Sequence, residues 1–64
     1  MKELTEKQQA IYDEIKEGVE KNRVPSIDTL GEETGITPQA IYQHIILIEK
    51  KGYLKRIGRR QYEL

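Results

Sequence analysis

The chain has 64 residues, a formal net charge of zero and 36% hydrophobic residues. This length allows one hydrophobic core and leaves no room for a second lobe or a deep substrate cleft. Cys is absent and His occurs once, which excludes a disulfide framework and a Cys-bearing zinc site. The amino terminus lacks the apolar run of a signal peptide, and no apolar stretch is long enough to span a membrane. We therefore expect one cytoplasmic domain over residues 1–64, with no cofactor, metal, small-molecule ligand or membrane contact.

The charges are distributed unevenly along the chain. Residues 1–35 contain nine acidic and five basic residues, whereas residues 36–64 contain six basic and two acidic residues. The two parts therefore have formal net charges of −4 and +4. This asymmetry is typical of a protein with one face for an anionic partner, and surface ion pairs between the two parts would explain it equally well.

A first helix is predicted to begin near Glu6. Thr5 and Gln8 have the spacing of a capping box, in which each side chain bonds to the backbone N–H of the other residue. Apolar residues then recur at four-residue intervals, which indicates one buried helix face: Ile11, Ile15 and Val19. The helix must end before Pro25, because the residue that precedes a proline avoids the α region.

A second, short helix is predicted over residues 27–34. Ser26 is a suitable N-cap, and Gly35 supplies a left-handed end. Gly31 lies inside this helix, where it costs about 1 kcal/mol relative to Ala. A helix tolerates that cost when another part of the backbone must approach closely.

Thr37 and Pro38 predict the beginning of a third helix, as a cap followed by a proline in the first helical position. This helix should continue to about Lys51. One of its faces is apolar, with Ile41, Ile45 and Ile48, and the rotation of 100° per residue places Gln39, Gln43, Ile46 and Lys50 on the other side.

The remaining residues predict two short strands around a Gly-containing turn, which form a hairpin over residues 54–64. The order of elements is therefore helix, helix, tight turn, helix, hairpin. It predicts a mainly α fold with a small β-hairpin, the three-helix winged helix-turn-helix. A small α+β domain with a corner between two helices is the alternative.

Three stretches of the chain match the pattern of one family. They are Leu4-Thr5-Glu6-Lys7-Gln8; Pro25-Ser26 with Leu30-Gly31 and Gly35-Ile36; and His44-Ile45 with Ile48, Lys51-Gly52, Leu54 and Arg56. Over nearly its whole length the chain thus resembles the N-terminal DNA-binding domain of LexA repressors. The resemblance implies a DNA-binding transcriptional regulator, and most simply a repressor.

The chain departs from the family pattern in several places. Thr29 stands where the family often has Glu, so a second capping box is lost. The turn before the third helix and the wing are both shorter, and the wing is more basic. These 64 residues do not include the self-cleaving peptidase domain of the family, with its Ser and Lys. The resemblance therefore implies a DNA-binding module, either a stand-alone regulator or a fragment of a longer one.

The outer face of the third helix is the predicted site of base recognition. In this class of fold, the helix after the turn enters the major groove with its amino-terminal residues against the bases. The amides of Gln39 and Gln43 can donate and accept at once, which suits the edge of adenine. The resemblance assigns operator contacts to Thr37, Gln39, Ala40, Tyr42 and Gln43. A solvated polar helix face is the alternative interpretation.

Basic residues of the hairpin predict contacts with the DNA backbone. Arg59 and Arg60 flank the wing tip, where they can reach phosphates or a narrow minor groove, and Arg56 lies on the strand before it. Charged residues on a strand edge also prevent aggregation. Ser26 caps a helix whose N–H groups suit a phosphate, although a purely structural cap is the favoured interpretation.

Three further interpretations concern enzymatic activity, an alternative function and the oligomeric state. The residues supply no nucleophile with a base and an orienting group, so we do not expect an enzyme. A winged helix that binds another protein without DNA is the alternative function. A homodimer is also expected, because Ile45-Ile46-Leu47-Ile48 is a continuous apolar run that cannot enter one core, which leaves Leu47 as the best contact.

Overall fold

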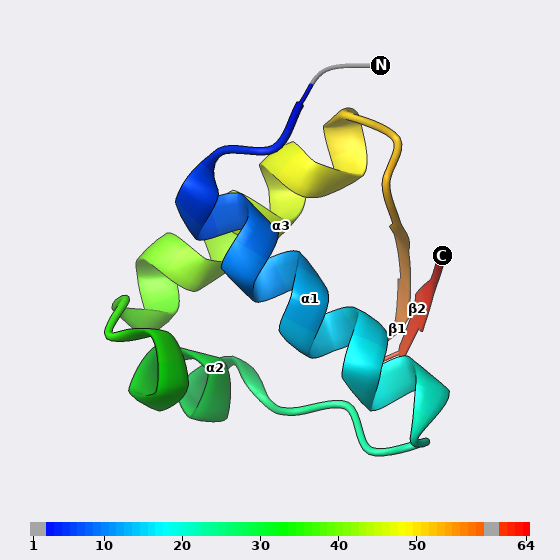
Figure 1. The fold of residues 1–64 in the computed structure, drawn as a ribbon, viewed down its shortest axis with the longest axis horizontal. Helices are drawn as coiled ribbons and strands as arrows, with labels where there is room; N and C mark the ends of the chain where they lie inside the picture. The colour runs from blue at the N-terminus through cyan, green and yellow to red at the C-terminus, as the bar shows by residue number, and fades with distance from the viewer. Residues whose placement is uncertain (1–2, 59–60) are drawn as a thin grey trace.

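The computed structural model describes residues 3–58 and 61–64, which form three helices and a two-stranded antiparallel hairpin (Figure 1). Its elements are α1 (Glu6–Glu20), α2 (Ile27–Thr34), α3 (Pro38–Lys50), β1 (Lys55–Gly58) and β2 (Gln61–Glu63). Helices α1 and α2 both pack against α3, and β2 contacts α1. The winged helix-turn-helix predicted from the sequence is confirmed. In the part of the chain that is described, no helix is long and apolar enough to cross a membrane.

Each helix begins at the capping residue that the sequence predicted. The side chains of Thr5, Ser26 and Thr37 each accept a hydrogen bond from the backbone N–H three residues later, at 3.2, 3.2 and 3.3 Å. The backbone N–H of Thr5 donates in return to Gln8 Oε1 at 3.1 Å, which completes the capping box. These bonds satisfy N–H groups that have no partner within their own helix.

The turn between α2 and α3 depends on two glycines. Gly35 has φ = 73° and ends α2 in the left-handed conformation that glycine adopts without strain. A Cβ atom on Gly31 would lie 2.7 Å from the carbonyl oxygen of Ile36. The absence of a side chain at Gly31 therefore allows the segment before α3 to lie directly against α2, as the sequence indicated.

The core consists of one apolar cluster to which every helix contributes. Its buried members are Ile11, Ile15, Leu30, Ile41, Ile45, Ile48, Leu54 and Tyr62. The predicted stripes of α1 and α3 both face this cluster. Val19 and Ile27 pack against its edge and are half-buried.

The segment that enters the hairpin and its second strand each add one of these core residues, Leu54 and Tyr62, and the hairpin contains an irregularity. Arg56 pairs with Tyr62, and Gly58 pairs with Gln61, so the register shifts between Arg56 and Gly58. Cross-strand partners share a face, so Arg56 lies on the same side as the buried Tyr62, toward the helices. Burial raises the pKa of Tyr62, and the nearby charge of Arg56 opposes that shift.

Lys51, which caps α3, connects the carboxyl end of that helix with residues at the beginning of the chain. Its Nζ donates to Gln8 Oε1 at 2.6 Å and to the carbonyl oxygen of Glu3 at 2.9 Å. Gln8 is only 4% exposed and Lys51 is half-buried, so the bond between them is partly shielded from solvent. The contact fixes the amino-terminal end of α1 against the carboxyl end of α3, next to the beginning of the hairpin.

Candidate nucleic-acid interface

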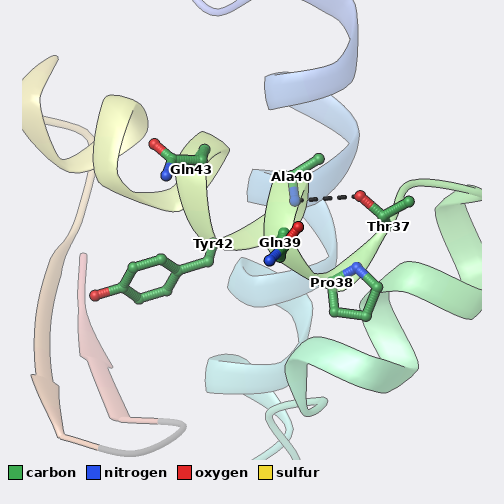
Figure 2. A pocket seen from close by; sticks show the side chains of 6 residues that line it. All are labelled: Thr37, Pro38, Gln39, Ala40, Tyr42 and Gln43. Atoms are coloured by element: carbon green, nitrogen blue, oxygen red, sulfur yellow. Dashed lines mark hydrogen bonds between the residues drawn. The ribbon is translucent and has the colours of Figure 1, made fainter.

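The outer face of α3 carries a shallow hollow beside the turn. It is lined by Thr37, Pro38, Gln39, Ala40, Tyr42 and Gln43, whose side chains are shown in Figure 2. Ile41 and Ile45 are buried on the opposite side of the helix, which orients Gln39 and Gln43 toward solvent. The structure thus brings together on one surface the N-cap and the four residues of α3 that were predicted to contact the operator.

The polar groups on this surface suit the edges of base pairs. Each Gln amide has an acceptor oxygen and two N–H donors, so it can bond to N6 and N7 of adenine. The hydroxyl of Thr37 accepts from the backbone N–H of Ala40 at 3.3 Å and keeps its own hydrogen available for a phosphate oxygen. A helix of this width fits the major groove, which is about 12 Å wide.

Tyr42 connects this surface with the hairpin. Its ring points from α3 toward the two strands (Figure 2) and is 42% exposed. The guanidinium carbon of Arg56 lies 5.4 Å from the centre of the ring, within the range of a cation–π interaction. The backbone N–H of Arg56 also donates to Glu49 Oε2 at 3.1 Å. Arg56 is therefore attached to α3 by its side chain and by its backbone.

Ser26 lies in a second hollow. Its hydroxyl is already used within the cap of α2, since it accepts from the N–H of Thr29 and bonds to Thr29 Oγ1 at 3.0 Å. A phosphate at this end of α2 would therefore be bound by backbone N–H groups rather than by the Ser26 hydroxyl. Arg23 and Gln61 line the same hollow, together with Glu33. The sequence analysis did not single out Arg23, although its position three residues before a helix cap was a usable signal.

Arg59 and Arg60 lie outside the described residues. Their predicted contacts at the wing tip therefore stay predictions. Of the basic residues proposed for the wing, Arg56 is the one that the described structure places beside α3.

An acidic pair lies between α1 and α2. A side-chain hydrogen bond with Glu33 raises the pKa of Glu14, and partial burial and the charge of Glu33 add to the shift. The sequence analysis did not identify this pair, because its members lie on different helices. In residues 3–58 and 61–64, no group of His or acidic side chains is arranged to hold a metal ion.

These features define the class of the protein. Two helices joined by a tight turn, an exposed polar third helix and a two-stranded wing are the parts of a winged helix-turn-helix domain. The family named LexA DNA binding domain matches residues 1–61, and the chain belongs to that family. The resemblance found in the sequence is confirmed, and the family is one of DNA-binding domains rather than enzymes.

Several LexA repressors are similar to this chain. That of Thermosipho melanesiensis is 44% identical over 57 residues, which are 88% of this chain and 29% of the repressor. The LexA repressor of Leptospira interrogans is 48% identical over 56 residues, which are 86% of this chain and 28% of that repressor. That of Thermotoga maritima is 42% identical over 57 residues, or 88% and 29%. The chain thus spans less than a third of the length of these relatives.

Proposed function

We propose that this chain acts as one domain over residues 1–64, binds double-stranded DNA in a sequence-specific manner and represses transcription. The observation that carries the proposal is the exposed polar face of α3 beside the wing, in a chain that belongs to the LexA DNA-binding domain family. In this arrangement α3 enters the major groove and the hairpin lies over the neighbouring backbone.

The proposed contacts divide by chemistry. Gln39 and Gln43 recognise base edges, while Thr37 and Ala40 contact phosphates or thymine methyl groups. Tyr42 takes part in the interface through its ring, which lies beside the guanidinium of Arg56. Arg56, Arg59 and Arg60 contact the DNA backbone or the minor groove, and the N–H groups at Ser26 bind a phosphate. The net charge of +4 in residues 36–64 and −4 in residues 1–35 favours binding through the carboxyl-terminal part of the chain.

The direct test is a titration of labelled random-sequence duplexes at low and at moderate salt. We expect affinity at low salt that falls steeply as salt is added, because phosphate contacts release condensed counterions. A chain with no duplex affinity at low salt would contradict the proposal and would favour the interpretation as a protein-binding module.

The contribution of the wing tip is tested by the double substitution of Arg59→Ala with Arg60→Ala. Binding to all sequences should weaken, and the slope of log K against log salt should decrease by about 0.9 for each phosphate that the variant no longer neutralises. An unchanged slope would remove the wing tip from the interface.

We further propose that two copies bind one palindromic site. A domain of this size covers about one half-site, which limits affinity and specificity. Leu47 supports the proposal because it is 43% exposed on α3, whereas Ile46 is half-buried. Sedimentation of the wild type and of Leu47→Lys, free and with DNA, is the test. The dimer would be contradicted by a wild-type protein that stays monomeric at high concentration and binds as one copy per duplex.

A further inference from the structure

Arg56 is held along one face of α3. The carboxylate of Glu49 accepts its backbone N–H at 3.1 Å, and the ring of Tyr42 lies beside its guanidinium at 5.4 Å. Tyr42 and Glu49 are seven residues apart, so they share a helix face and are separated by about 10 Å along the axis. The Arg56 side chain therefore extends along α3 from its carboxyl end toward its amino-terminal half, which is the part that carries Gln39 and Gln43.

The hairpin limits the other directions that this side chain can take. Arg56 pairs with Tyr62 across the hairpin, and Tyr62 is 9% exposed in the core. Arg56 itself is half-buried. Its guanidinium is thus confined to the boundary between α3 and the wing.

We propose that Tyr42 is a positioning residue that acts through Arg56, and that it orients the guanidinium toward the DNA phosphate next to the bases contacted by Gln39 and Gln43. This inference rests on the proposed DNA-binding function. A guanidinium that stacks on an aromatic ring uses its flat face and keeps the N–H groups on its edge for a phosphate. Holding it in place before DNA arrives reduces the conformational freedom lost on binding.

The arrangement has a consequence for specificity. The wing and the recognition helix are separate elements, and Arg56 connects them at the edge of the base-contacting surface. If Tyr42 fixes that connection, a phosphate contact by the wing sets the register of α3 in the groove. Tyr42 itself then contributes to affinity without discriminating between bases.

A double-mutant cycle tests this coupling. Affinity for the best duplex site is measured over a range of salt for the wild type, Tyr42→Leu, Arg56→Gln and the double variant. Tyr42→Leu should weaken binding by about two- to fivefold, which is the size of a cation–π contact, and should lower the salt slope toward that of Arg56→Gln. The double variant should bind as Arg56→Gln does, because Tyr42 has no role without its partner.

Tyr42→Phe is the matched control, since it keeps the ring and removes only the hydroxyl. It should retain the coupling with Arg56 and the salt slope of the wild type. Additive effects in the cycle would overturn the inference. The inference would also be overturned if Tyr42→Leu left the salt slope unchanged but removed the preference for the best site over random duplexes. Tyr42 would then contact a base directly.

An NMR measurement on the free protein separates this inference from the proposed function. The Cδ protons of Arg56 should show an upfield ring-current shift in the wild type and in Tyr42→Phe, and the shift should be lost in Tyr42→Leu while the remaining amide spectrum stays folded. Absence of the shift in the wild type would overturn the inference alone, even if DNA binds. A wild type that shows the shift and binds no duplex would overturn the proposed function, and with it the role of Tyr42 on DNA.

Discussion

The helical part of the molecule and the hairpin are held in different ways. The three helices bury a continuous cluster of Ile and Leu side chains, most of them fully inaccessible to solvent. The hairpin contributes Leu54 and Tyr62 to that cluster and otherwise depends on polar and aromatic contacts of Arg56 with α3. We therefore expect the helices to supply most of the stability, and the contacts of Arg56 with α3 to be removable without unfolding the domain.

The largest effect is expected from Ile41→Ala in the helical core. Removing this fully buried side chain should cost about 2–5 kcal/mol. A domain of this length has a total stability of about 3–10 kcal/mol, so the variant loses a large part of it. Chemical denaturation followed by circular dichroism measures the loss. Leu47→Ala on the exposed side of α3 is the control, and an equal loss there would contradict the difference between the two faces.

Gly31→Ala tests the close approach between α2 and the segment before α3. The added Cβ atom would meet the carbonyl oxygen of Ile36 at 2.7 Å, so the backbone must shift. We expect a loss of about 1–3 kcal/mol in the free energy of unfolding, despite the better helix propensity of Ala. Glu32→Ala on the exposed side of the same helix should be nearly neutral. A Gly31→Ala variant more stable than the wild type would show that the contact does not constrain the turn.

Glu49→Ala tests the attachment of the hairpin. The substitution removes the acceptor of the Arg56 backbone N–H. Hydrogen exchange of that amide should become about tenfold faster, equivalent to about 1.4 kcal/mol, while amides in the centre of α1 and α3 change little. The exposed Glu63→Ala in β2 is the matched control. Uniform acceleration across the helices would mean that the hairpin and the core open together.

The smallest effect is expected at the acidic pair, and it is stabilising. A raised pKa means that folding favours the protonated form of Glu14, so the ionised form destabilises the folded state at neutral pH. Glu14→Gln should therefore stabilise the domain by about 0.2–0.5 kcal/mol at pH 7, a small value because the carboxyl is partly exposed. The gain should disappear as the pH falls below 4.5, the ordinary pKa of a glutamate side chain, because Glu14 is then protonated in both the folded and the unfolded chain. Thermal unfolding at both pH values measures it, and a gain that persists in acid would contradict the pair.

Much of the fold was predictable because its signals are local. The caps at Thr5, Ser26 and Thr37, the left-handed Gly35 and the four-residue spacing of Ile11 and Ile15 each act within one or two helical turns. The same periodicity separated the buried and exposed faces of α3, and so identified the residues that line its outer hollow.

The contacts that the sequence did not predict join residues far apart in the chain. Lys51 with Gln8, Arg56 with Tyr42 and Glu14 with Glu33 each depend on how two elements pack, and no spacing rule specifies that. Long side chains such as Arg and Lys also have many rotamers, and their partners follow from the surface that surrounds them.

In the proposed complex, α3 recognises the base sequence, whereas the wing supplies affinity that is independent of sequence. The most direct test compares the affinities of Gln39→Ala and Gln43→Ala for the best site and for random duplexes, with Gln9→Ala on α1 as the matched control. We expect each α3 variant to lose about 1–3 kcal/mol at the best site and little on random DNA, and the control to change neither. Equal losses on both kinds of DNA would contradict the claim, because these side chains would then contact only the backbone.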